Sequence, residues 1–140
     1  PLALPDRWDG QSGLYHTDDA AFGLCEDFPY GLRAAAHLLR NYQLEHGIRT
    51  LLGKGGYQGE DGIITRWSPA RDHNDTHAYV ARVSRLTGFA PDQELDLEDG
   101  RTVAAILEAM NRVELGLADD GPLPWSDGAM QSALELAGFE

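Results

Sequence analysis

The sequence contains a strongly amphipathic segment, Thr102-Val103-Ala104-Ala105-Ile106-Leu107-Glu108-Ala109-Met110-Asn111-Arg112-Val113-Glu114-Leu115-Gly116. Its large apolar residues recur at intervals of three and four, a period that predicts one buried face of an α-helix over about 101–115. Gly116 has the position of the glycine that commonly follows the last turn of a helix. The residues of the predicted buried face are Val103, Ile106, Leu107, Met110 and Val113.

Glu114 is the carboxyl group that this helix would place at its C-terminal end. The negative end of the helix dipole and partial burial both disfavour the charged form of a carboxyl group there. Such a group can stay protonated near neutral pH and act as a general acid. The alternative interpretation is an ordinary solvated glutamate in a last helical turn.

Four further segments have helical patterns, and together they predict an all-α fold, a compact domain of five or six helices. Asp27 and Asn74 are expected to cap two of these helices, while the residue before Pro69 should end a third. Alternation of apolar and polar residues is not sustained anywhere, so no sheet is expected. The expected ranges are about 29–46, 62–67, 74–87 and 127–137. The predicted core comprises Leu32, Leu39, Ile63, Ile64, Val80, Val83, Ile106, Met110 and Leu134.

Residues 1–140 are long enough for a single domain with a core of its own. Residues 1–28 are expected to form an irregular lobe that wraps the helices, because Pro, Gly and Asp interrupt isolated aromatic residues. Residues 53–60 are glycine-rich and predict a flexible loop, the most mobile internal segment. The loop lacks the spacing of a phosphate-binding loop around Lys54.

Composition excludes several classes of function. The chain has 23 acidic and 11 basic residues, a formal charge of -12, so it should repel nucleic acid. No apolar run is long enough to span a membrane, and no signal sequence opens the chain. Cys25 is the single cysteine and is expected in the core rather than as a nucleophile. Pro1 without a methionine is compatible with processing, a missing leader or a longer parent chain.

Several short motifs resemble a family of small phage and prophage virion proteins. The quoted motifs of this chain are Trp8-Asp9-Gly10, Phe28-Pro29-Tyr30-Gly31-Leu32-Arg33-Ala34, Ile63-Ile64-Thr65-Arg66-Trp67-Ser68-Pro69 and Asn74-Asp75-Thr76-His77-Ala78-Tyr79. Val113-Glu114-Leu115-Gly116 and Pro124-Trp125 complete the resemblance, which covers nearly the whole chain. The chain departs from the family pattern at three places. Leu2-Ala3 replaces the family's opening Gly-Asn, and His73 stands where the family often has Glu. Residues 53–60 resemble an insertion relative to the family.

The family is also distantly similar to lysozyme-superfamily glucosaminidases and transglycosylases, with a circular permutation between them. This resemblance implies a lysozyme-like fold and cleavage of peptidoglycan glycan strands. A single acid, Glu114, fits lytic transglycosylation better than a hydrolysis that needs two carboxylates. The alternative is a non-catalytic virion structural or interaction protein.

The candidate site follows from these motifs. Glu114 is the expected acid/base, and four aromatic residues are expected to line a sugar groove, although each of them could equally be a core residue. Two polar residues are expected to position the glycan. The expected aromatic residues are Tyr30, Trp67, Tyr79 and Trp125, and the polar ones are Asn74 and Thr76.

Two other groups of residues have mainly structural interpretations. His73 and His77 are four residues apart, but no third ligand is evident, so no metal or other cofactor is expected. Arg66 with Trp67 and Arg71 could stack on a sugar or attach a loop to a helix. No serine-hydrolase motif occurs. The expected partners are cell-wall glycan or other virion proteins, and the expected location is the virion, with the bacterial cytoplasm before assembly.

Overall fold

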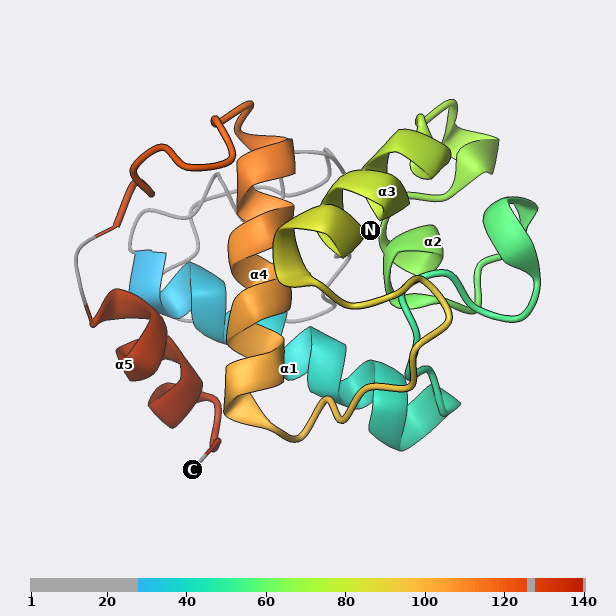
Figure 1. Cartoon of the computed structure of the whole chain (residues 1–140). Helices are drawn as coiled ribbons and strands as arrows, with labels where there is room; N and C mark the ends of the chain where they lie inside the picture. Colours follow the sequence, from blue (N-terminus) through green and yellow to red (C-terminus); the bar gives the residue numbers. More distant parts are fainter. Residues whose placement is uncertain (1–27, 126–127, 140) are drawn as a thin grey trace.

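The computed structural model describes residues 28–125 and 128–139. Within these ranges the protein is helical and has no strand, which confirms the predicted all-α fold (Figure 1). The elements are α1 (Phe28–His46), η2 (Gly56–Gln58), α2 (Ile63–Trp67), η3 (Ala70–Asp72), α3 (Thr76–Thr87), α4 (Gly100–Glu114) and α5 (Ala129–Leu136), where η denotes a short 3-10 helix.

α4 is the central helix, with α1, α3 and α5 packed around it (Figure 1). Its N-terminus is capped by Asp99, whose carboxylate accepts a hydrogen bond from the Arg101 amide at 3.1 Å. After its last residue, Gly116 takes a φ of +67°, and this left-handed residue ends the helix as predicted. Its fully buried residues are Val103, Ile106, Leu107 and Met110, whereas Val113 is partly buried.

α1 and α5 pack against each other and close the core on the side away from α3 (Figure 1). Arg40 of α1 fastens the end of α5, because its guanidinium donates to the Ala137 carbonyl at 2.7 Å. The same guanidinium lies 4.7 Å from the ring centroid of Phe139. No described helix is both long enough and apolar enough to cross a membrane.

The segment 88–99 supplies core residues that the helical pattern did not predict. Leu95 and Leu97 are buried, and the acidic residues between and after them are exposed. Hydrogen bonds join this segment to residues 49–52, with the Leu95 amide bonded to the Arg49 carbonyl at 2.7 Å. A segment that belongs to no helix therefore fills part of the core.

The predicted core is buried except for Leu134, which is partly buried against it. One cap prediction was wrong. α3 begins at Thr76 with Asp75 as its cap, and the Asn74 side chain instead donates to the Pro69 carbonyl at 3.1 Å. α5 begins at Ala129, two residues later than expected. The predicted lobe over residues 1–28, except for Phe28 at the start of α1, lies outside the described residues, as do Cys25 and the expected cap Asp27.

The glycine-rich loop contains η2 and packs closely around Asp61 and Gly62. The Asp61 carboxylate accepts hydrogen bonds from the Gly55 amide at 3.0 and 3.2 Å. Gly62 lies directly against the backbone of Leu52, so a Cβ atom there would overlap the Leu52 carbonyl group. This position has no space for a side chain.

Gly62→Ala should therefore lower the free energy of unfolding by about 1–3 kcal/mol, the usual cost of overpacking. Gly121→Ala is the matched control, because a Cβ atom there would lie 3.4 Å from the nearest neighbour, the Ala118 Cβ, which is ordinary contact. Urea unfolding of both variants measures the difference. Equal stability of the two variants would contradict the close packing at Gly62.

Candidate functional site

The side chain of Glu114 joins three helices through one carboxylate oxygen. Trp67, the last residue of α2, donates from Nε1 to Oε2 at 3.1 Å, and Tyr79 of α3 donates from its hydroxyl to the same oxygen at 2.8 Å. The acceptor is the last residue of α4. Two donors on one oxygen fix the orientation of the carboxyl group.

Both donors come from buried side chains. Trp67 is 6% exposed and Tyr79 is 7% exposed, so their polar atoms need partners inside the protein. Burial, and next the charge and hydrogen bond of Glu114, raise the pKa of Tyr79 well above its usual value near 10. The phenol therefore remains a hydrogen-bond donor throughout the neutral range.

The charge on Glu114 is subject to opposing effects. Its place at the C-terminus of α4 sets it near the negative end of the helix dipole, which disfavours a carboxylate. The two donors act in the other direction, because hydrogen bonds to a carboxylate stabilise its charged form.

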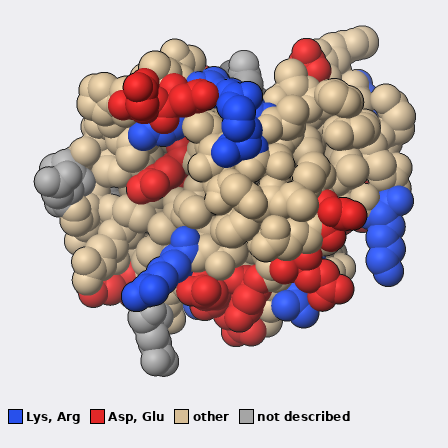
Figure 2. All heavy atoms as spheres, viewed as in Figure 1, with Lys and Arg blue, Asp and Glu red and all other residues tan. Residues whose placement is uncertain are grey.

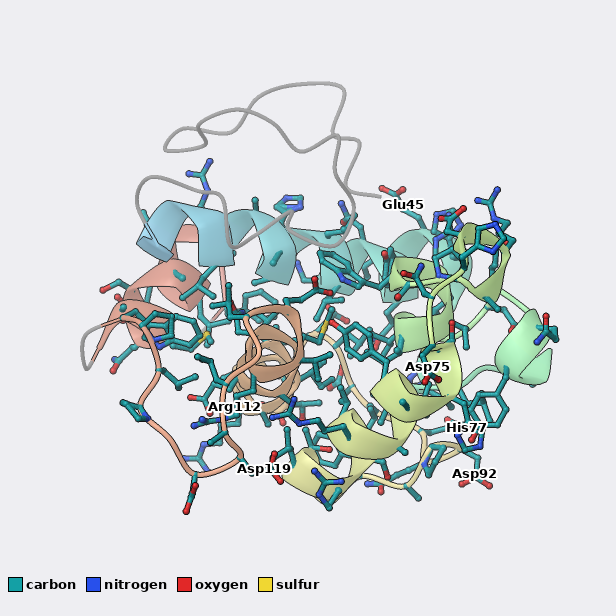
Figure 3. All side chains as sticks on the ribbon, turned by 90° about the horizontal axis from the view of Figure 1, so that it is seen from above. Glu45, Asp75, His77, Asp92, Arg112 and Asp119 are labelled. Atoms are coloured by element: carbon teal, nitrogen blue, oxygen red, sulfur yellow. The ribbon has the colours of Figure 1, made fainter. Side chains whose placement is uncertain are left out.

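Glu114 also lines a pocket of about 440 Å³ between α3, the end of α4 and the loop before α3. Asp75 lies at the start of α3 (Figure 3) and contributes a second carboxylate to the pocket wall. Arg82 is the one cationic residue of this wall among the described residues. The lining residues are Ser68, Asn74, Asp75, Ala78, Tyr79, Arg82, Val113 and Glu114.

Arginines from α3 and α4 anchor the loop that follows α4. Arg82 and Arg85 both bind the Asp119 carboxylate, at 3.0 and 2.8 Å. Hydrogen bonds from Arg85 and then Arg82 hold the pKa of Asp119 below its usual value. Arg112 donates to the Ala118 carbonyl at 2.8 Å, and Figure 3 shows its side chain near Asp119. Basic and acidic side chains lie side by side on this part of the surface (Figure 2).

The structure brings together only part of the predicted site. Tyr79 and Asn74 line the Glu114 pocket, whereas Trp67 supports Glu114 without lining it. Thr76 is buried, and its hydroxyl donates to the Ser68 carbonyl at 2.6 Å, so it fixes the loop before α3. Trp125 lines a separate pocket with Glu108 and Arg112. The side chain of Tyr30 lies outside the described part of the chain.

The sequence did not predict three polar residues of the pocket lining, namely Ser68, Asp75 and Arg82. Arg82 could have been predicted from the sequence, because a residue three positions after Tyr79 lies on the same face of a helix. Asp75 was assigned only a general role in the first turn of the helix. Ser68 gave no signal beyond preceding a proline.

The histidine pair does not form the arrangement that a metal site would need. His73 precedes α3 in a left-handed conformation with a φ of +64°, so the two rings do not share a helical face. The ring of His77 instead packs on Tyr57 of the glycine-rich loop, 4.3 Å between centroids. Arg71 pairs with Glu60 of that loop at 2.6 Å. These contacts attach the loop to the start of α3.

Comparison with known proteins connects the chain to a phage. It is 32% identical over 110 residues to "Protein P5" of Pseudoalteromonas phage PM2. The chain is related to a phage protein. The match covers 79% of this chain and 59% of the phage protein, so the chain spans about three fifths of that relative's length. No protein-family model matches the chain.

Tyr79→Phe should lower the free energy of unfolding at pH 7 by about 1–3 kcal/mol, because it removes one of the two hydrogen bonds that the Glu114 Oε2 accepts. The aromatic ring remains and no large cavity forms, so the decrease in the free energy of unfolding measures the contribution of the hydroxyl group. Urea unfolding measures it. A variant as stable as the wild type would contradict the hydrogen bond to Glu114.

Tyr79 also predicts a dependence of stability on alkaline pH. Because its pKa is raised in the folded state, the stability that it contributes is complete below about pH 10 and is lost as the pH rises further. The decline of the unfolding free energy above pH 10 should therefore be shallower in Tyr79→Phe than in the wild type. Chemical unfolding at a series of pH values tests this, and parallel curves would contradict it.

Proposed function

We propose that the protein is a virion-associated phage protein that cleaves the glycan strands of bacterial peptidoglycan with Glu114 as the acid/base. The observation that carries the proposal is the Glu114 carboxyl group, held by Trp67 and Tyr79 at the wall of a pocket. A fixed carboxyl group in a pocket is the element that glycoside cleavage requires. The similarity to a protein of phage PM2 supports the phage context.

The proposed reaction uses one carboxyl group twice. Glu114, when protonated, donates its proton to the oxygen of the glycosidic bond as the bond from that oxygen to the sugar C1 breaks. The C6 hydroxyl of the same sugar then attacks C1, and its proton returns to Glu114. The products are two shorter pieces of the strand, one of which ends in a 1,6-anhydro sugar, and no water is consumed. This route needs no second catalytic carboxylate.

The geometry favours this route over hydrolysis by two carboxylates. Asp75, the other carboxylate of the pocket wall, already caps α3 by accepting from the Ala78 amide at 3.0 Å. Glu114 instead accepts hydrogen bonds at its Oε2 from side chains of two other helices. In the proposed site Tyr79 and Asn74 contact the sugar, and Trp67 positions Glu114.

A non-catalytic role in the virion is the second candidate. It is favoured by the burial of Trp67 and Tyr79, whose rings stabilise the fold rather than form a broad exposed platform for sugars. In that case Glu114 serves to join α2, α3 and α4, and the partners are other virion proteins. Recovery of the protein in fixed ratio from purified particles would support this role, and its absence from particles would contradict it.

Glu114→Gln tests the enzymatic proposal, because glutamine keeps the size of the side chain but cannot transfer the proton. We expect the wild type to release 1,6-anhydro fragments from purified sacculi and Glu114→Gln to do so about 10²–10⁴ times more slowly. Glu108→Gln is the control, since Glu108 lies on the same helix but lines another pocket.

Circular dichroism establishes that both variants are folded. Equal rates for the wild type and Glu114→Gln would remove Glu114 from the mechanism. No release by the folded wild type would contradict cleavage and leave the structural role as the function.

A further inference from the structure

We propose that Arg82 is a specificity residue that binds a carboxylate of the glycan, so that strands containing muramic acid bind better than neutral polymers of N-acetylglucosamine. This inference rests on the proposed function, because it names the substrate feature that the Glu114 pocket selects. Arg82 and Glu114 line the same pocket.

The guanidinium of Arg82 is held in place before any ligand binds. Its Nε donates to Asp119 at 3.1 Å, and its Nη2 pairs with the same carboxylate and donates to the Leu117 carbonyl. Nη1 makes no hydrogen bond to a described residue, and the side chain is 26% exposed. A fixed guanidinium with one nitrogen unused among these contacts is prepared to bind an anion at little entropic cost.

The positive charge of Arg82 lies among acidic residues of the pocket wall. Glu114 and Asp75 line the wall, and two acidic residues would disfavour an anionic ligand. Asp119 is shared between Arg82 and Arg85, so this cluster of three side chains keeps a net charge of +1. This excess positive charge offsets one of the two carboxylates of the pocket wall, in a chain with a net charge of -12.

Carboxylates distinguish peptidoglycan from neutral glycans of the same backbone. Each muramic acid bears a lactyl group that ends in a carboxylate, or in an amide bond to a short peptide that itself carries carboxylates. Polymers of N-acetylglucosamine have neither. Arginine binds carboxylates through charge-assisted hydrogen bonds, and a neutral glycan has no carboxylate to accept them.

Binding to a catalytically disabled protein tests the inference without relying on turnover. The protein carrying Glu114→Gln is titrated with three probes: peptide-free glycan strands with free lactyl carboxylates, peptide-bearing strands, and N-acetylglucosamine oligomers. We expect tighter binding of the first or second probe than of the third. Preference for the first identifies the lactyl carboxylate, and preference for the second identifies the peptide.

Arg82→Gln, added to the Glu114→Gln protein, should weaken binding of the preferred probe about 10- to 100-fold, the range for a charge-assisted hydrogen bond. The affinity for the neutral oligomer should not change. Arg85→Gln removes the same charge from the Asp119 cluster but not from the pocket wall, so it should change the preference by no more than about twofold. Arg82→Lys keeps the charge and should restore part of the preference if the loop stays attached.

The inference is overturned if Arg82→Gln weakens all three probes equally, or if Arg85→Gln has the same effect as Arg82→Gln. Equal binding of charged and neutral probes to the Glu114→Gln protein would overturn it while leaving glycan cleavage intact. Failure to bind any probe would contradict this inference and the proposed function together.

Discussion

The carboxyl group of Glu114 joins α2, α3 and α4 at one point. It is the last residue of α4, and its Oε2 accepts hydrogen bonds from the end of α2 and from α3. α2 has only five residues, too few for independent stability, so its position depends on such tertiary contacts. A single polar group therefore connects the apolar core to the pocket.

Much of the architecture followed from local patterns in the sequence. The spacing of Val103, Ile106, Leu107 and Met110 predicted the buried face of α4, and Gly116 predicted its end. The core contribution of Leu95 and Leu97 did not follow, because they lie in an acidic segment with neither helical nor strand periodicity. Their burial depends on pairing with residues 49–52, which local patterns do not encode.

The site was only partly predictable for a related reason. Glu114 stood out by its place at a helix end, but its donors are 47 and 35 residues away in the chain. Asp75 rather than Asn74 caps α3, because the side-chain amide of Asn74 donates to the Pro69 carbonyl instead. The aromatic side chain of Trp125 suggested a place in a sugar groove, but the fold places it at another pocket.

The most direct test of a catalytic Glu114 is a crystal structure of the Glu114→Gln protein with a bound peptidoglycan oligosaccharide. We expect a glycosidic oxygen within about 2.6–3.2 Å of the side chain of residue 114, the distance needed for proton transfer. A glycan bound elsewhere on the protein, with the Glu114 pocket empty, would contradict it.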